Sequence, residues 1–418
     1  MNRRKFILDL IFWILAFFLG YSIKKDVEDW NFFKKDASVA DIKKQVRKRV
    51  GSETDDTKRV QELFNEKGKI YFPKDTYIIS KTITIYDDTE VICHPQATFL
   101  LAANARCYMF KSDTTTGKKN FKWSGGIIDG NDANQGNETV SGTNHNVSRG
   151  LTLYNFYKIE VCNLLIKSIR GQAITHWGNQ HAYFHDIEIW QDLSPFELTL
   201  FPGGGSRRDG ITGASRNLTY ENIRGFTDDD FIAIAPGCNW EGGGNLFPID
   251  SVFIRNIKME RNGKDSSFAS YRGFAVYSGG FDYKIKNIVI ENVNATVNTE
   301  FMRIQGVIDN LSIKDINATL DMKDPSNARG FLWVRLVQNN GGSEDIGGSI
   351  INNLTINKVN YQYVNTNVLK PYVNVSDSSN IKNLKLSDIY GYYPINVSSG
   401  GEFINVDANS IINNLELN

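Results

Sequence analysis

The residues best suited to chemistry in this chain are aspartates that recur at the distance of one sequence repeat. Asp209 is followed, about one repeat later, by the run Asp228, Asp229 and Asp230. Hydrolysis of a glycosidic bond needs one carboxylic acid to protonate the leaving oxygen and one carboxylate to activate water or attack carbon. Neighbouring carboxylates meet that need, because each raises the pKa of the other. A solvated turn is the alternative interpretation of such an Asp run.

Other side chains near these aspartates are candidates for substrate binding. An arginine can hold a carboxylate or phosphate through two hydrogen bonds. The candidates of this kind are Arg170, Arg207, Arg208, Arg272 and Arg303, with Gln305 two positions beyond the last. His176 and Trp177 are candidates for a substrate floor, with packing in the interior as the alternative. The spacing of His176, His181 and His185 matches no metal-binding pattern, so we expect no metal site.

The element that must position these residues is a short repeated segment. Its form is N-ψ-x-ψ-x-(N/D)-ψ, where ψ is apolar, and successive copies start roughly 20 to 40 residues apart, a period typical of repeat architectures. Clear copies occupy residues 163–169, 217–223, 310–316, 353–359 and 383–389.

The apolar period of two within each copy excludes helical repeats, and the irregular spacing argues against a propeller. In a parallel β-helix, each coil adds short strands, apolar side chains point inward, and the recurring asparagines stack from coil to coil. We therefore predict an all-β fold, a right-handed, single-stranded parallel β-helix. A helix over residues 57–66, preceded by Asp55 and Asp56, is expected to open the fold and cap one end.

The N-terminal segment differs from the rest of the chain. Three basic residues precede an apolar stretch that two lysines close, which predicts a signal peptide or an uncleaved membrane anchor over residues 1–25. No A-x-A cleavage site follows, which favours the anchor. We expect an extracellular or cell-surface protein, a charged spacer over residues 26–50 and a β-helix domain over residues 51–418.

The composition limits the classes of partner. Lys and Arg total 47, as do Asp and Glu, so bulk charge gives no support for nucleic-acid binding. An apolar content of 41% is enough for a core and argues against global disorder. The cysteines form no zinc motif, and we expect buried free thiols, with one disulfide as the alternative. They are Cys93, Cys107, Cys162 and Cys238.

Several motifs resemble those of a known superfamily. Residues 55–77 look like the N-terminal coil of the pectate-lyase superfamily, and residues 126–130 resemble the G-x-I-D-G coil of polygalacturonase-type enzymes, glycoside hydrolase family 28. That family then carries N-T-D, D-D, G-H-G and R-I-K motifs. The corresponding residues here are Asp209, Asp229-Asp230, Arg272-Gly273 without the His, and Arg303-Ile304-Gln305 with Gln for Lys. The chain also resembles phage tail-spike β-helix proteins.

The resemblance to family 28 implies roles for individual residues. Asp229 would be the general acid, Asp209 and Asp230 would position the attacking water for inversion, and Arg303 would bind a sugar or its carboxylate.

Three functions stay open at this point. The first is a glycoside hydrolase that needs no cofactor and acts on an acidic or cell-wall polysaccharide. The second is a polysaccharide lyase on the same fold, with Ca²⁺ held by residues 228–230 and Arg272 or Arg303 as the base. The third is a non-catalytic glycan-binding or structural β-helix of the tail-spike type. A homotrimer is a possible assembly for such proteins.

Overall fold

The computed structural model describes ten stretches of the chain. They are residues 44–135, 148–191, 208–235, 248–263, 269–278, 283–321, 329–338, 345–364, 370–392 and 403–417. The predicted segment 1–25 lies outside the described residues, as do most of the predicted spacer, Arg207 and Cys238. Residues 44–418 form one compact unit.

Short strands make up most of the described chain. In the N-terminal half they are β1 (Lys44–Gln45), β2 (Gly68–Phe72), β3 (Thr76–Ile79), β4 (Ile83–Ile85), β5 (Thr89–Cys93), β6 (Thr98–Leu101), β7 (Tyr108–Ser112), β8 (Lys118–Ser124), β9 (Ile127–Asp129), β10 (Arg149–Tyr154), β11 (Phe156–Lys167), β12 (Ile174–Trp190) and β13 (Ile211–Phe226). Beyond these are β14 (Asp230–Ile234), β15 (Ile249–Met259), β16 (Ser270–Tyr277), β17 (Lys284–Gln305), β18 (Val307–Asp321), β19 (Gly330–Val334), β20 (Leu336–Gln338), β21 (Asp345–Gly348), β22 (Ile350–Val364), β23 (Val373–Val375), β24 (Asn380–Tyr392), β25 (Ile404–Val406) and β26 (Ile411–Leu417). The helical elements described are α2 (Thr57–Asn65) and the short 3₁₀ helix η3 (Asp132–Asn134).

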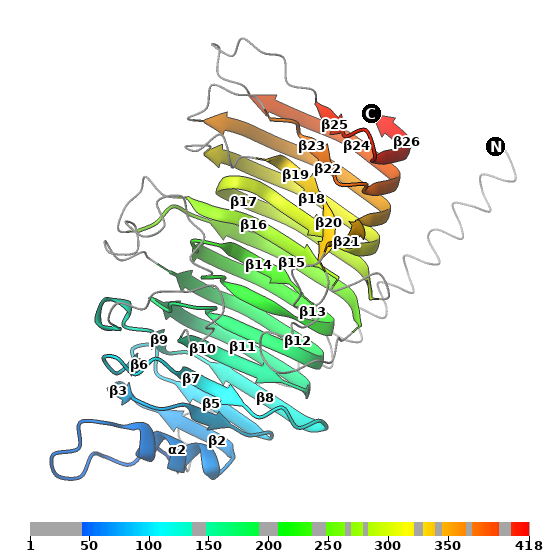
Figure 1. The fold of residues 1–418 in the computed structure, drawn as a ribbon. Coiled ribbons are helices and arrows are strands. Elements are labelled where there is room, and N and C mark those ends of the chain that lie inside the picture. Colours follow the sequence, from blue (N-terminus) through cyan, green and yellow to red (C-terminus); the bar gives the residue numbers. More distant parts are fainter. Residues whose placement is uncertain are drawn as a thin grey trace, which may run out of the picture. The chain divides into compact units, whose positions relative to one another are not determined.

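The strands stack in parallel, coil upon coil, from the blue to the red end of Figure 1. One face runs β2–β5–β8–β11–β12–β13–β15–β17–β18–β22–β24–β26. A second face runs β4–β7–β10–β12–β13–β14–β16–β17–β19–β23–β25. A third runs β3–β6–β9–β11. This is the predicted parallel β-helix, and β1 extends its first face into the predicted spacer by pairing with β2.

Apolar side chains in register fill the interior of the coils. One such row, one residue per coil, consists of Ile174, Ile211, Ile232, Phe274, Met302 and Leu332. Aromatic rings stack beside it, with centroids 4.6 Å apart for Phe301 and Phe331 and 4.6 Å for Phe331 and Tyr372. Each fully buried side chain of this kind stabilises the fold by about 1.5–3 kcal/mol, so the whole row fixes the register of the second face.

The recurring asparagines occupy the bends of the coils. Asn222, Asn256 and Asn292 have φ values of 54°, 57° and 52°, a left-handed conformation that Asn tolerates better than most residues. The Asn256 amide donates to Asn222 Oδ1 at 2.9 Å, and the Asn292 amide donates to Asn256 Oδ1 at 2.7 Å. The predicted ladder of asparagines is therefore confirmed, and backbone geometry explains why the motif repeats.

The predicted helix over residues 57–66 is present as α2, but it is not capped as expected. Asp56 is the N-cap residue, and its carboxylate makes no capping hydrogen bond. It is fully buried and pairs instead with Arg59 at 2.6 Å and Arg49 at 2.6 Å. Asp55 Oδ1 accepts the Thr57 N–H at 2.9 Å and so satisfies one free donor of the first turn. The role of α2 as a cap over strand edges stays a prediction.

Candidate active site

Successive coils bring charged residues to one register position on the second face. Gly210 N donates to Asp230 O at 2.9 Å, which places the coil of Asp209 directly beside the coil of Asp230. Asp230 begins β14 and pairs with Arg272 of β16, and Arg272 in turn pairs with Glu300 of β17. The coil repeat therefore unites candidate residues that are far apart in the sequence.

The carboxylates of Asp209, Asp229 and Asp230 form a compact group, here called the aspartate cluster. One oxygen of each lies within 4.8 Å of an oxygen of the other two. The three residues are 9%, 8% and 4% exposed, and the Thr212 hydroxyl donates to Asp209 Oδ2 at 2.7 Å. The spacing is shorter than the roughly 6.5–9.5 Å of a typical inverting pair. The expectation of inversion therefore depends on the family resemblance and not on this distance.

Arg272 is the cation of the aspartate cluster. Its Nη2 pairs with Asp229 Oδ1, and its Nε lies 2.7 Å from Asp230 Oδ1. The Arg272 side chain is 9% exposed, and its guanidinium lies 5.1 Å from the centroid of the Tyr271 ring. The guanidinium thus lies between Asp229 and Asp230, and its charge opposes the rise in the pKa of Asp230.

The surroundings of Asp209 and Asp230 shift the pKa values of their carboxyl groups. Burial, together with the charges of Asp229 and Asp230, raises the pKa of Asp209 well above its ordinary value. Burial raises the pKa of Asp230 to about 6, although Arg272 opposes the shift. The Tyr277 hydroxyl donates to Asp230 Oδ2 at 3.3 Å, and burial and the Asp230 charge raise the pKa of Tyr277. The pKa values of Asp209 and Asp230 are thus both raised, and Arg272 is the largest influence that opposes the rise at Asp230.

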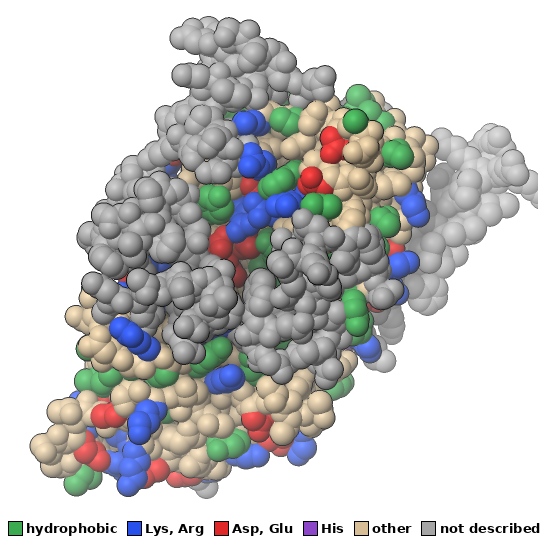
Figure 2. All heavy atoms as spheres, viewed as in Figure 1, with side chains coloured by type: hydrophobic (Ala, Val, Ile, Leu, Met, Phe, Trp, Pro, Cys, Tyr) green, Lys and Arg blue, Asp and Glu red, His purple; other side chains and the backbone are tan. Residues whose placement is uncertain are grey.

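A second charged group lies on the coils that follow the aspartate cluster. Arg303, Arg329 and Arg335 place their guanidinium carbons 4.9, 5.2 and 4.6 Å from the centroid of the Trp333 ring, and these four residues are here called the arginine–tryptophan cluster. Arg303 pairs in β-sheet register with Trp333, and its Nη2 lies 2.5 Å from Glu300 Oε1. Figure 2 shows basic and acidic side chains gathered side by side on the face in view.

The side chains predicted as a substrate floor, His176 and Trp177, are both buried, which matches the alternative of packing in the interior. His176 is fully buried, and its ring nitrogens lie 3.0 Å from Ser215 Oγ and 2.6 Å from Tyr220 Oη. Burial lowers the pKa of His176 to about 3, so the ring is neutral. Trp177 is 6% exposed and stacks on Tyr154 with ring centroids 5.5 Å apart.

Two further substrate-binding candidates are also internal. Arg208 is fully buried, with its guanidinium 3.5 Å from Asp132 and 3.6 Å from Asp228. Asp228 therefore belongs to an internal ion network and not to the aspartate cluster. Gln305 is 2% exposed, and its amide donates to the Leu336 carbonyl at 3.2 Å, so it does not replace the family's Lys on the surface.

Arg170 is internal as well. It is 8% exposed, its Nε pairs with Asp132 at 2.5 Å, and its Nη2 donates to the Asp132 carbonyl at 2.9 Å. The predicted basic stripe for an anionic glycan therefore does not extend to the coil of Arg170. Arg303 is partly buried, and sequence reasoning missed its neighbours on the Trp333 ring, Arg329 and Arg335.

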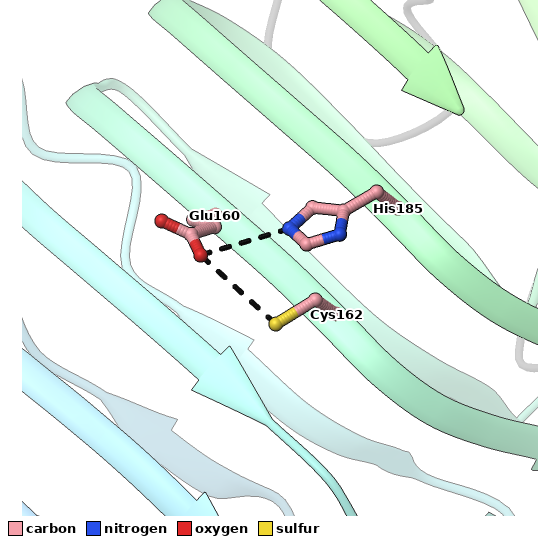
Figure 3. A group of neighbouring side chains, drawn as sticks. All are labelled: Glu160, Cys162 and His185. Atoms are coloured by element: carbon pink, nitrogen blue, oxygen red, sulfur yellow. Dashed lines mark hydrogen bonds and ion pairs between the residues drawn. The ribbon is translucent and has the colours of Figure 1, made fainter. Parts of the chain in front are cut away.

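The three histidines singled out in the sequence do not form one site. His176 is in the core, and His181 contacts Tyr157 with ring centroids 5.2 Å apart. His185 instead lies beside Glu160 and Cys162, a group that spacing in the sequence did not reveal (Figure 3). Cys93 and Cys162 are buried free thiols, as predicted, whereas the free thiol of Cys107 is only partly buried.

A groove with a volume of about 760 Å³ lies on the coils of β15, β17, β18, β22 and β24. Asn294, Asn317, Asn360 and Gln362 line it together with Tyr390, and none of the three clustered aspartates takes part. Glu260 is the carboxylate in the groove lining, and it pairs with Lys258 at 3.2 Å, so the groove lacks the group of neighbouring carboxyls found in the aspartate cluster.

Known proteins resemble this chain in their three-dimensional structure but not in their sequence. No family model and no curated protein sequence matches the chain. The endo-xylogalacturonan hydrolase from Aspergillus tubingensis matches with a TM-score of 0.60 and 14% identity, over 87% of this chain and 99% of its own. The family 28 exopolygalacturonase from Yersinia enterocolitica matches with a TM-score of 0.52 and 14% identity, over 88% of this chain and 78% of its own.

A third solved structure is a tailspike protein of the E. coli bacteriophage HK620, a double mutant in complex with a pentasaccharide. It matches with a TM-score of 0.55 and 12% identity, over 87% of this chain and 64% of the tailspike. The chain shares a right-handed parallel β-helix fold with these proteins, as the repeats in its sequence predicted. At these identities the likeness is one of fold.

The part of the chain that the structure describes contains no helix that is both long and apolar enough to cross a membrane. The apolar stretch predicted to serve as a signal or an anchor lies among residues 1–25, outside the described residues. Export, membrane attachment and trimerisation stay predictions.

Proposed function

We propose that the chain is a glycoside hydrolase that cleaves an acidic polysaccharide at the aspartate cluster. The observation that carries this proposal is a compact group of carboxyls in which Asp209, whose pKa is raised by burial and by its neighbours, can serve as the acid, and Asp230, which pairs with Arg272, can serve as the base. Hydrolysis of a glycoside needs such an acid and base side by side.

The proposed roles differ in one respect from those that the family resemblance implies. The resemblance places the general acid at Asp229. Here Arg272 pairs with Asp229 and Asp230, and a carboxylate held by a guanidinium donates a proton poorly. Asp209 accepts a hydrogen bond from Thr212 and has the raised pKa that an acid requires. We therefore assign the acid to Asp209, the base to Asp230, and to Asp229 the binding of Arg272.

These roles define a balanced reaction. Asp209 gives its proton to the glycosidic oxygen as the bond from that oxygen to the anomeric carbon breaks. A water molecule forms the new bond to the anomeric carbon, and its proton passes to Asp230. The two protonation states are then restored through solvent before the next turnover.

The arginine–tryptophan cluster supports an acidic substrate. Guanidinium groups bind carboxylates through paired hydrogen bonds, and an indole ring offers an apolar surface to the face of a sugar. Arg303, Arg329 and Arg335 all border the Trp333 ring on coils next to the aspartate cluster. A uronate ring on Trp333 would place its carboxylate among cations.

The lyase alternative is less well supported. It requires Ca²⁺ among residues 228–230 and an arginine base. Arg208 stands beside Asp228 and Arg272 beside the other two aspartates, so guanidinium groups already balance these carboxylates. Although burial acts in the opposite sense, Asp230 and Asp229 raise the pKa of Arg272 well above its ordinary value, which opposes its use as a base.

The test is an assay of the full chain on polymers of uronates and on neutral cell-wall polysaccharides. We expect new reducing ends from an acidic polymer, without an ultraviolet-absorbing unsaturated product. Asp209→Asn should slow this release by about 10²–10⁴-fold, whereas Asp315→Asn, a matched change at a bend remote from the cluster in sequence, should leave the rate unchanged. Binding of an acidic glycan without cleavage would instead favour the non-catalytic alternative.

A further inference from the structure

Glu160, Cys162 and His185 meet on the first face of the β-helix, away from the residues that the proposed reaction uses. Cys162 of β11 is the register partner of His185 of β12, so the two side chains stand on adjacent coils. Glu160 lies two residues before Cys162 on the same strand and therefore on the same side of it. Figure 3 shows the three side chains directed toward a common point between the coils.

The three potential ligand atoms are close together. Glu160 Oε1 lies 3.6 Å from His185 Nε2 and 4.0 Å from Cys162 Sγ, and all three atoms lie within 4.8 Å of one another. Bonds of about 2.0–2.3 Å in tetrahedral geometry place zinc ligands about 3.5 Å apart. Small rotations of these side chains would therefore suffice to complete such a site.

Neighbouring residues orient the ligands in the manner common to metal sites. Asp186 Oδ2 lies 2.7 Å from His185 Nδ1, which leaves Nε2 for the common point. The Tyr183 ring stacks on His185 with centroids 4.1 Å apart and so fixes the plane of the imidazole. The Asn163 amide donates to Cys162 Sγ at 3.5 Å and so helps to orient the sulfur.

We propose that Glu160, Cys162 and His185 bind one zinc ion, with a water molecule at the fourth position. A thiolate, an imidazole and a carboxylate form a ligand set that suits Zn²⁺ better than Mg²⁺ or Ca²⁺, which prefer oxygen ligands alone. Glu160 and Cys162 are 7% and 3% exposed, so the ion would be held at the margin of the folded coils and not on a mobile surface.

Lys122 is the competitor of the ion at this site. Its Nζ lies 2.9 Å from Glu160 Oε1, the same oxygen that faces His185. Zinc must displace this ammonium group, and removing it should therefore strengthen binding. The bound ion would link β11 to β12. The next strand along this face is β13, which begins two residues after Asp209.

The test is calorimetric titration of the full, chelator-treated chain with Zn²⁺, alongside its thermal unfolding. We expect one equivalent of Zn²⁺ to bind and to raise the melting temperature. Cys162→Ser and His185→Gln should each weaken binding by at least about tenfold, as losses within metal sites do. Lys122→Gln should tighten it. Cys107→Ser and His181→Gln are matched controls that should change nothing.

Titration with Co²⁺ gives a second readout that does not depend on variants folding. A thiolate ligand produces an intense near-ultraviolet charge-transfer band, which we expect for the unmodified chain. Absence of this band, absence of Zn²⁺ binding, or equal affinity in the unmodified, Cys162→Ser and His185→Gln chains would each overturn the proposal. None of these measurements uses glycan cleavage, so this proposal and the proposed hydrolase activity fail or succeed separately.

Discussion

The pH dependence of cleavage follows directly from the environment of Asp230. Burial raises the pKa of this carboxyl to about 6, and the proposed mechanism requires it ionised as the base. In the free enzyme, kcat/KM should therefore fall on the acid side with an apparent pKa near 6. Burial and two neighbouring carboxylates raise the pKa of the acid, Asp209, so activity should also fall at higher pH, when Asp209 loses its proton.

The size of the acid-side effect can be worked out from that value. One unit below its pKa, about a tenth of a carboxyl group is ionised, so kcat/KM at pH 5 should be about a tenth of its plateau. The ordinary value of 3.8 would instead leave activity at pH 5 almost unchanged. Initial rates on the acidic polymer, measured at low substrate concentration from pH 4 to 9, distinguish a pKa of about 6 from one of 3.8. An acid limb near pH 4 would refute the assignment of Asp230 as the buried base.

The same carboxyl should affect stability, independently of activity. Its pKa is raised on folding from 3.8 to about 6, so the folded state binds its proton more tightly than the unfolded state does. Its contribution to stability is therefore fully present below pH 3.8 and is lost as the pH rises through about 6. A difference of about two units corresponds to about 3 kcal/mol of unfolding free energy. Asp230→Asn should remove this dependence, and denaturant titrations of both chains at pH 4 and pH 7 would measure it.

Three further outcomes are expected. Asp209→Asn should lower kcat by about 10²–10⁴-fold without loss of the folded state, and unchanged turnover would contradict its role as the acid. Trp333→Ala should raise KM for an acidic glycan more than it lowers kcat, which initial rates over a range of substrate concentrations would show. Asp56→Asn should lower the unfolding free energy by about 3–5 kcal/mol, because it breaks the buried pair with Arg59. Urea denaturation would measure this loss of free energy, and an unchanged midpoint would contradict a stabilising role of the Asp56–Arg59 ion pair.

The fold was predictable because its determinants are local and repeated. The apolar period of two and the asparagines of each repeat, such as Asn222 and Asn256, fix the strands and their bends. The proximity of Asp209 to Asp230 followed from the same repeat. The sequence did not show which aspartate of the run 228–230 lies beside the coil of Asp209, because the coils differ in length; in the structure it is Asp230.

The sequence did not predict which of several side chains are buried. Where both faces of a strand are buried, apolar and polar residues do not alternate, so the pattern does not show which side chains point inward. Residues at the start of β12, including His176 and Trp177, are buried in succession, so no alternating pattern marks which ones face inward. The bridging position of Arg272 and the meeting of Cys162 with His185 depend on pairing between strands. Spacing along a single sequence does not specify such contacts between coils.

The most direct test of the central claim is cleavage in water enriched in ¹⁸O, with mass spectrometry of the products. Hydrolysis at the aspartate cluster predicts one ¹⁸O atom at each new reducing end from the acidic polymer, and about 10²–10⁴-fold slower formation of labelled ends by the Asp209→Asn chain. Unlabelled, unsaturated products would show elimination instead. Binding with no product at all from the unmodified chain would contradict catalysis by Asp209 and Asp230.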